Sequence, residues 1–332
     1  MLLDLARTRR VLFFGGKGGV GKTTVAAATA LAAAREGRRV LLASTDPAHN
    51  LGHLWDRPVG PRAVRVAAGL EALELDPGTI VDRHLAEVGE TLRRLMPAHL
   101  AGEVDKHMAL SRDAPGMQEA ALLEQIAELI EGESGRYDLV VLDTAPSGHT
   151  ARLMALPEIM AAWTEGLLSR QKRAERFGTA LGNLGAGSGS HDVASKVFGG
   201  GPDGGSRDDR IRHILHRRRH RLERLRAALA DAERTAFVIV LVAERLPVLE
   251  TLELHAQLVA AGVSVAGLVV NKRTPADAGG FLADRSAQED VHLATLAAGL
   301  PGLATQELPL LARDVTGAAA LEAFADLVAA AR

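Results

Sequence analysis

A short segment rich in glycine and lysine constrains the fold of this chain more than any other feature. Residues 16–23 read G-K-G-G-V-G-K-T, which fits the pattern G-x-x-x-x-G-K-[S/T]. An apolar run at 10–15 precedes this segment, and an alanine-rich run at 21–36 follows it. A strand, a glycine-rich turn and a helix in this order direct backbone N–H groups at an anion. We therefore predict a phosphate-binding loop between a β-strand and an α-helix.

The two lysines of this loop indicate its ligands, ATP and Mg²⁺. We expect Lys22 to contact the β- and γ-phosphates and the Thr23 hydroxyl to bind Mg²⁺. Lys17 lies at the mouth of the loop, where it can reach a nucleotide bound in a partner subunit. This predicts a nucleotide-gated homodimer, and the alternative is a solvent-exposed loop lysine. The residues expected to bind the nucleotide here are Gly16, Lys17, Gly18, Gly19, Val20, Gly21, Lys22, Thr23 and Thr24.

Further apolar runs end in acidic or polar residues, and helical patterns separate most of them. This alternation predicts an α/β fold of the P-loop NTPase class, with a mainly parallel sheet flanked by helices. Right-handed crossovers place the ends of such strands on one edge of the sheet. The runs are 40–43 before Ser44-Thr45-Asp46, 70–75 before Asp76, 138–142 before Asp143, 236–242 before Glu244, and 263–270 before Asn271.

Two of these acidic residues are candidates for the chemistry of hydrolysis. Asp46 follows the second strand, where a carboxylate can orient and polarise the attacking water, and it is also a candidate metal residue. Asp143 ends an apolar strand and is expected to hold Mg²⁺, together with Thr23. The predicted catalytic residues are thus Asp46, Lys17 and Lys22. The alternative for each aspartate is a helix N-cap.

Two stretches interrupt the alternation and predict an inserted α-helical subdomain. One apolar stripe holds Leu85, Val88, Leu92 and Leu95, and another holds Leu122, Leu123, Ile126 and Ile130. The expected organisation is a nucleotide-binding core at 1–83, 136–153 and 234–332, with helical parts at 84–135 and 154–233. A Gly/Ser-rich linker at 185–205 is expected to be mobile.

Composition excludes several classes of function. The 332 residues carry a formal net charge of −2, which provides no global attraction for nucleic acid or for anionic lipid. The chain has no cysteine, so thiolate metal sites are excluded. Its first residues lack an apolar stretch of signal-peptide length, and the alanine-rich run at 25–34 is shorter than the ~20 residues of a membrane span. We expect a cytoplasmic protein without stable membrane insertion.

Two longer segments resemble one family. Residues 46–51, D-P-A-H-N-L, are similar to switch I of the ArsA/Get3 family, and residues 143–150, D-T-A-P-S-G-H-T, are similar to its switch II, with Ser147 in place of the usual threonine. The loop pattern with two lysines is shared with the wider class that includes MinD-like and ParA-like ATPases. The resemblance implies nucleotide contacts by Asn50, an adenine contact by Asn271, a base pocket around Pro309 and Leu310, and a Glu244 that faces the partner's nucleotide.

The absence of cysteine departs from the arsenite pumps and from the zinc-bound dimers of this family. We therefore expect neither zinc nor arsenite binding. His213, His216 and His220 lie within the arginine-rich segment 210–226, which is a poor site for a cation. We interpret that segment as an amphipathic helix with Ile211, Leu215, Leu222 and Leu225 facing inward. Contact of its basic face with lipid or nucleic acid stays open.

The resemblance leaves two roles, and the leading one is a Get3-like targeting or chaperone ATPase with a hydrophobic helical client. The alternative is an ArsA-like energising subunit for a membrane anion transporter. A ParA-like role would need DNA binding, which the charge does not favour. The expected client residues are Met96, Met108, Met117, Met160, Trp163 and Leu167, with Leu92, Leu95, Leu122, Ile126 and Leu168 beside them. Core packing is the alternative for this set.

Overall fold

The computed structural model of the chain describes residues 1–46, 50–95, 101–112, 117–132, 135–144, 220–221, 223–276 and 279–331. Its centre is an eight-stranded sheet in the order β3-β4-β2-β5-β1-β6-β7-β8. Neighbouring strands are parallel except for the pair β3 and β4. The strands are β1 (Val11–Gly15), β2 (Val40–Ser44), β3 (Val64–Ala67), β4 (Leu70–Glu74), β5 (Leu139–Asp143), β6 (Thr235–Leu241), β7 (Val265–Arg273) and β8 (Thr305–Pro309). The predicted α/β fold with a mainly parallel sheet is confirmed.

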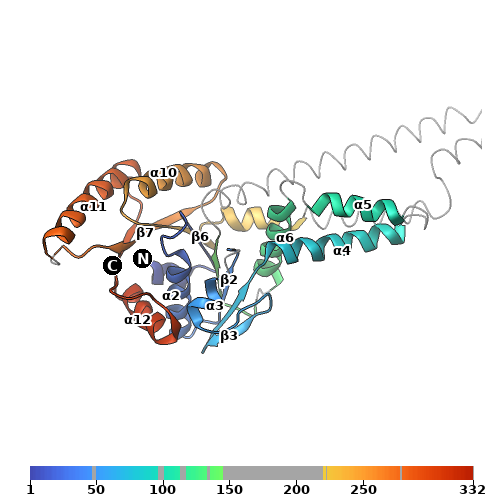
Figure 1. The fold of residues 1–332 in the computed structure, drawn as a ribbon, viewed down its shortest axis with the longest axis horizontal. Helices are drawn as coiled ribbons and strands as arrows, with labels where there is room; N and C mark the ends of the chain where they lie inside the picture. The colour runs from blue at the N-terminus through green and yellow to red at the C-terminus, as the bar shows by residue number, and fades with distance from the viewer. Residues whose placement is uncertain are drawn as a thin grey trace, which may run out of the picture.

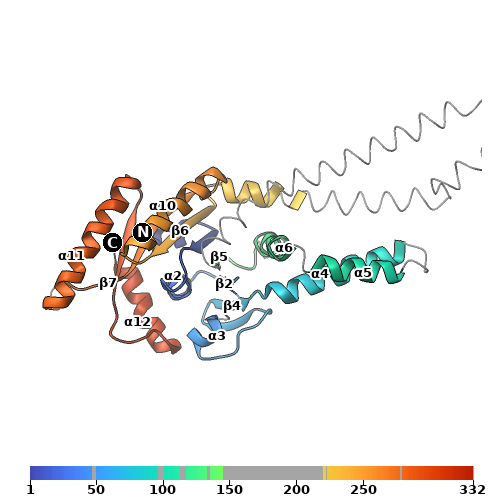
Figure 2. The same cartoon turned by 45° about the horizontal axis from the view of Figure 1, so that its top comes forward.

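Helices cover both faces of this sheet (Figures 1 and 2). Strand side chains alternate between the faces, so Val11 and Phe13 pack with α6 and α10, whereas Leu12 and Phe14 pack with α2 and α12. The helices with both ends described are α1 (Leu2–Thr8), α2 (Lys22–Arg35), α3 (Asn50–Trp55), α4 (Pro77–Leu95), α5 (Ala101–Arg112), α6 (Met117–Gly132), α10 (Arg245–Ala260), α11 (Gly280–Gly299) and α12 (Gly317–Ala330).

The alanine-rich sequence of α2 suits its position between the sheet and α12. Alanine has the highest helix propensity, and its small side chain lets the helix lie close to its neighbours. Residues 25–34 of this helix are all buried. The phosphate loop therefore leads into a helix that is enclosed by the core.

Three helices lie between β4 and β5, in the region predicted to be helical. In both views α4 and α5 lie side by side and extend away from the sheet (Figures 1 and 2). The predicted stripe on α6 is confirmed, because Leu122, Leu123, Ile126 and Ile130 are buried. Leu122 and Ile126 were also expected beside the client site, with core packing as the alternative, and their burial favours that alternative. Both side chains belong to the core beneath α6.

Several element boundaries differ from the predictions. A helix, α1, precedes β1, in a segment for which no element was predicted. The first helix of the insertion begins at Pro77, not at 84, because the Asp76 carboxylate accepts hydrogen bonds from the N–H groups of Gly78 and Thr79 at 3.1 and 3.2 Å. The edge strands β3 and β8 were not predicted, since half-exposed edge strands lack the continuous apolar pattern of the central ones.

The inserted helical region is described only in part. Within residues 210–226, Leu225 is buried as expected, and Arg224 pairs with Glu131 of α6 at 2.7 Å. The linker 185–205, His213 and His216 lie outside the described residues. Among the helices that are described, none is long and apolar enough to cross a membrane.

Candidate phosphate and metal site

The loop between β1 and α2 needs glycine for reasons of conformation and space. Gly16, Gly19 and Gly21 have φ values of 141°, 81° and 90°, which L-residues with side chains rarely adopt. A Cβ atom on Gly16 would lie 2.1 Å from the Val240 carbonyl oxygen, and one on Gly21 would lie 2.4 Å from Nδ2 of Asn271. Gly21 precedes the first residue of α2 and contributes no capping side chain. The N–H groups of the first turn of α2 therefore have no side-chain cap from Gly21, as an anion site requires.

Lys22 is the buried cation of this loop, with 5% of the residue exposed. Its ammonium group donates to the carbonyl oxygen of Lys17 at 3.1 Å. Burial lowers the pKa of Lys22, while the negative charges of Asp143 and Asp46 act in the opposite direction. A phosphate bound in the loop would add the negative charge that favours the charged form of this lysine.

Asp143 is the buried carboxylate next to the loop. Its Oδ2 accepts hydrogen bonds from the hydroxyls of Thr23 at 2.7 Å and Ser44 at 3.0 Å. Its Oδ1 is buried and accepts no hydrogen bond from the part of the chain that the structure describes. Burial raises the pKa of Asp143 to about 6, against the opposing effects of the Thr23 hydrogen bond and the Lys22 charge. A buried, unpartnered carboxylate oxygen beside a threonine hydroxyl is a donor set that fits Mg²⁺.

Asp46 lies directly after β2, on the same edge of the sheet. Its backbone N–H donates to the Ser44 hydroxyl at 3.2 Å, and that hydroxyl also donates to Asp143. The Thr45 N–H donates to the carbonyl oxygen of Asp143 at 2.9 Å. The two predicted acidic residues are therefore joined through the end of β2. Of the other switch I residues, Asn50 begins α3, and 47–49 lie outside the described residues.

Lys17 has a partner within its own chain. Its ammonium group lies 2.7 Å from Oε1 of Glu250 on α10, and both side chains are partly exposed. Leu246 lies one turn before Glu250 on α10, and Leu249 directly precedes Glu250 in the sequence. These leucines are 62% and 47% exposed. The ion pair thus joins the mouth of the phosphate loop to a segment of α10 that also exposes two apolar side chains.

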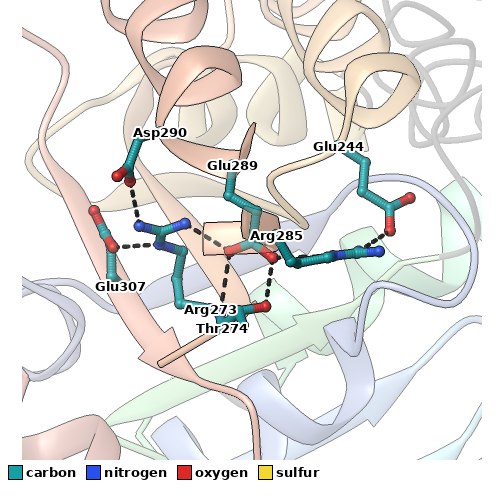
Figure 3. A network of polar contacts seen from close by, with 7 residues as sticks. All are labelled: Glu244, Arg273, Thr274, Arg285, Glu289, Asp290 and Glu307. Carbon is teal, nitrogen blue, oxygen red and sulfur yellow. Dashed lines mark hydrogen bonds and ion pairs between the residues drawn. The ribbon is translucent and has the colours of Figure 1, made fainter. Parts of the chain in front are cut away.

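The residues expected around the base lie at the ends of β7 and β8. Asn271 is buried, and its Nδ2 donates to the Val20 carbonyl oxygen at 2.9 Å. Nζ of Lys272 donates to the Gly19 carbonyl oxygen at 3.1 Å. Pro309 ends β8, and the N–H of Leu310 donates to the Arg273 carbonyl oxygen at 2.8 Å. Glu244 pairs with Arg285 at 2.6 Å (Figure 3).

The expected client residues are only partly described. Met108 on α5 and Met117 at the start of α6 are partly buried and pack against the core. Leu110, also on α5, is 77% exposed. Met96, Met160, Trp163, Leu167 and Leu168 lie outside the described residues, as do the side chains of Leu92 and Leu95.

Comparison with known proteins finds relatives along nearly the whole chain. Residues 9–330 match the family of anion-transporting ATPases. An ATPase get3 of Aspergillus niger is 30% identical over 330 residues, which cover 97% of this chain and 91% of that relative. The chain belongs to the ArsA/Get3 family. Its sheet and loop are therefore those of an ArsA/Get3-type P-loop fold.

Other ArsA/Get3 relatives carry a different name. Arsenical pump-driving ATPases of Acidiphilium multivorum and Escherichia coli are each 31% identical over 318 residues. The match covers 94% of this chain and 48% of either relative, so the chain spans about half the length of those proteins. Relatives of both names fit the ArsA/Get3 family, so family membership does not distinguish the two roles.

Two residues of this ArsA/Get3 site were not assigned a role from the sequence. Ser44 links Asp46 to Asp143, and Glu250 holds Lys17. A hydroxyl at the end of a buried strand, directly before an acidic loop, was a usable signal for Ser44. No comparable signal existed for Glu250, because its contact joins residues that are far apart in the sequence.

Proposed function

We propose that this chain is a Mg²⁺-dependent ATPase that hydrolyses ATP to ADP and phosphate. The observation that carries this proposal is the buried Oδ1 of Asp143, which is unpartnered within the described residues and lies beside the loop that holds Lys22 and Thr23. The family supports it, because its members carry the name ATPase.

In the proposed site the phosphate chain of ATP occupies the loop formed by residues 16–23. The N–H groups at the start of α2 bind phosphate oxygens, and Lys22 neutralises charge on the β- and γ-phosphates. Thr23 and Asp143 would hold Mg²⁺, which would neutralise negative charge on the phosphates when bound. Asn271, Pro309, Leu310 and Asn50 would complete the nucleotide site, as the family resemblance implies.

Asp46 is the proposed hydrolytic residue. Its carboxylate orients a water molecule for attack on the γ-phosphorus and accepts a proton from it. A bond forms between the water oxygen and phosphorus, while the bond from phosphorus to the β,γ-bridging oxygen breaks and leaves ADP. The Ser44 hydroxyl ties the Asp46 backbone to Asp143, so one hydrogen-bonded unit would orient the water and hold the metal.

The proposed working unit is a homodimer. Lys17 would leave Glu250 and contact the nucleotide of the partner subunit, and Glu244 would face the same nucleotide. Leu246 and Leu249 support this arrangement, because they expose apolar surface on the segment of α10 that holds Glu250, the partner of Lys17. A two-fold axis near the loop mouth would bury both leucine pairs against each other.

The proposed use of the ATPase cycle is Get3-like binding and release of a hydrophobic helical client. The alternative is an ArsA-like energising role for a membrane anion transporter. The lack of cysteine favours the first role, since a thiolate site for arsenite is excluded in this chain. The client site is proposed on the helical insertion, on an exposed face that includes Leu110.

Three proteins test the assignment of residues in the proposed ATPase: the wild type, Lys22→Ala and Asp46→Asn. Phosphate release is measured with and without Mg²⁺, and ATP binding is measured separately by calorimetry. We expect Lys22→Ala to lose ATP binding and Asp46→Asn to bind ATP without hydrolysing it. Equal loss of ATP affinity in both variants would contradict the role of Asp46. No hydrolysis by the wild type would contradict the proposal as a whole.

A further inference from the structure

Glu289 of α11 is a buried carboxylate at the centre of the network in Figure 3. The residue is 4% exposed, and it accepts hydrogen bonds from Arg273 at 2.6 Å and from the hydroxyl and N–H of Thr274 at 2.7 and 3.1 Å. Arg285, one turn earlier on α11, lies 3.4 Å from the same carboxylate. Glu289 therefore anchors the residues at which β7 ends.

The end of β7 has an unusual backbone that needs such an anchor. Lys272 has a φ of 58°, in the left-handed region that residues other than glycine seldom occupy. The pairing of β7 with β8 shifts in register between Val270 and Arg273, as expected for a local bulge. A left-handed lysine costs roughly 1 kcal/mol or more, so surrounding contacts must favour it. Glu289 binds the next two residues, Arg273 and Thr274.

This backbone directs two side chains at the phosphate loop. Nδ2 of Asn271 reaches the Val20 carbonyl oxygen and Nζ of Lys272 reaches that of Gly19. The contact at Asn271 is tight, because a Cβ atom on Gly21 would overlap its Nδ2. The position of the phosphate loop thus depends on how β7 ends.

The same cluster reaches two other segments of the proposed nucleotide site. Arg273 accepts a hydrogen bond from the Leu310 N–H through its carbonyl oxygen, and Arg285 pairs with Glu244 at 2.6 Å. Figure 3 shows Arg273 and Arg285 on either side of Glu289. One buried carboxylate is therefore connected to the phosphate loop, to the loop after β8 and to Glu244.

Glu289 differs from the other carboxylates that surround Arg273. Asp290 and Glu307 lie 2.6 and 2.7 Å from the guanidinium group, but their side chains are 66% and 50% exposed. Exposed ion pairs contribute little, because solvent screens them. Of the three, Glu289 is the one that is buried and also binds Thr274.

We propose that Glu289 is a positioning residue for nucleotide binding, which acts by holding the end of β7 so that Asn271 and Lys272 brace the phosphate loop. The inference rests on the proposed nucleotide site. Loss of the Glu289 charge should loosen the loop and weaken nucleotide binding. Glu289 contacts none of the groups assigned to hydrolysis, so the rate at saturating ATP should be retained.

The test compares Glu289→Gln with Asp290→Asn, which removes the neighbouring exposed partner of Arg273. Kd for ADP, KM and kcat for ATP, and Tm are measured for both variants and for the wild type. We expect Glu289→Gln to raise Kd and KM roughly threefold to tenfold with kcat unchanged, and Asp290→Asn to match the wild type. A lower Tm with unchanged Kd and KM would show a structural role alone and overturn the inference.

Two further variants keep the test decisive. Thr274→Val removes only the hydroxyl that binds Glu289, and it serves as the test variant if Glu289→Gln does not fold. It should raise KM by a smaller factor than the one expected for Glu289→Gln. Lys272→Ala combined with Glu289→Gln, or with Thr274→Val, should be less than additive in Kd, because both changes act on one contact. Full additivity, or an unchanged KM in Thr274→Val, would overturn the inference. A wild type that binds no nucleotide would contradict the proposed function instead.

Discussion

The ammonium group of Lys17 lies 2.7 Å from Oε1 of Glu250, so the lysine proposed to serve a second subunit is paired within its own chain. The pair joins the mouth of the phosphate loop to α10. For Lys17 to reach another nucleotide, this ion pair must open. The energy that opposes opening is small, because both side chains are more than one third exposed.

Glu250→Gln should lower the free energy needed to release Lys17 for contact with the partner's nucleotide. We expect the variant to form the nucleotide-bound dimer at a lower protein concentration, by a few-fold at most, since an exposed pair contributes about 0–1 kcal/mol. Sedimentation with a nonhydrolysable ATP analogue measures the effect. Glu253→Gln, on the same helix and hydrogen-bonded to Gln257 at 3.1 Å, is the matched control. Weaker dimerisation of Glu250→Gln would indicate that Glu250 itself supports the interface.

Leu249→Glu should weaken the proposed dimer without unfolding the subunit. Leu249 is 47% exposed beside Glu250, and a carboxylate there would be desolvated in an interface. The control is Val259→Glu on the same helix, because Val259 is 55% exposed but lies more than two turns away. Sedimentation with and without nucleotide distinguishes the two variants. If both behave like the wild type, the dimer face does not include this part of α10.

Asp143 should give the metal-free protein a specific pH dependence. Its pKa is raised from 3.8 to about 6, so between these values the folded state holds a proton that the unfolded state has released. The free energy of unfolding should therefore fall as the pH rises from about 4 to about 6, by at most roughly 3 kcal/mol.

Asp143→Asn should lack this contribution. The free energy of unfolding of both proteins is measured with urea at pH 4 and pH 7, with chelator present. The difference between the two pH dependences isolates Asp143, because the contributions of the other titrating groups cancel. An equal pH dependence in the two proteins would contradict the role of burial at Asp143. With Mg²⁺ present, we expect the wild type to gain stability above pH 6 and the variant to gain little.

Leu110→Glu should separate client binding from folding. Leu110 is 77% exposed, so the charge should leave Tm nearly unchanged while it weakens the binding of a fluorescent leucine-rich helical peptide. Met117→Glu should lower Tm instead, because Met117 packs against the core. Peptide binding that is unaffected by Leu110→Glu would place the client site elsewhere or favour the transport alternative.

The fold was predictable where local patterns decide the structure. The glycine conformations of the phosphate loop and the apolar strands that lead to Asp46 and Asp143 are fixed by residues close in sequence. The contacts of Lys17 with Glu250 and of Arg273 with Glu289 were not predictable, because they join charged side chains from different elements, and those partners depend on the packing of α10 and α11. Leu122 and Ile126 show a related difficulty, since an apolar stripe fits both a core and a binding face.

The Ser44 hydroxyl carries a single proton, so it can donate to only one partner at a time. An ionised Asp143 draws that proton toward itself, and the oxygen lone pairs of Ser44 are then free to accept the Asp46 N–H. An Asp143 protonated on Oδ2 would become a donor and compete for the same lone pairs. The orientation of the Ser44 O–H bond therefore depends on the ionisation of Asp143. The backbone N–H of Asp46 contacts the same hydroxyl, so it lies next to the group that responds.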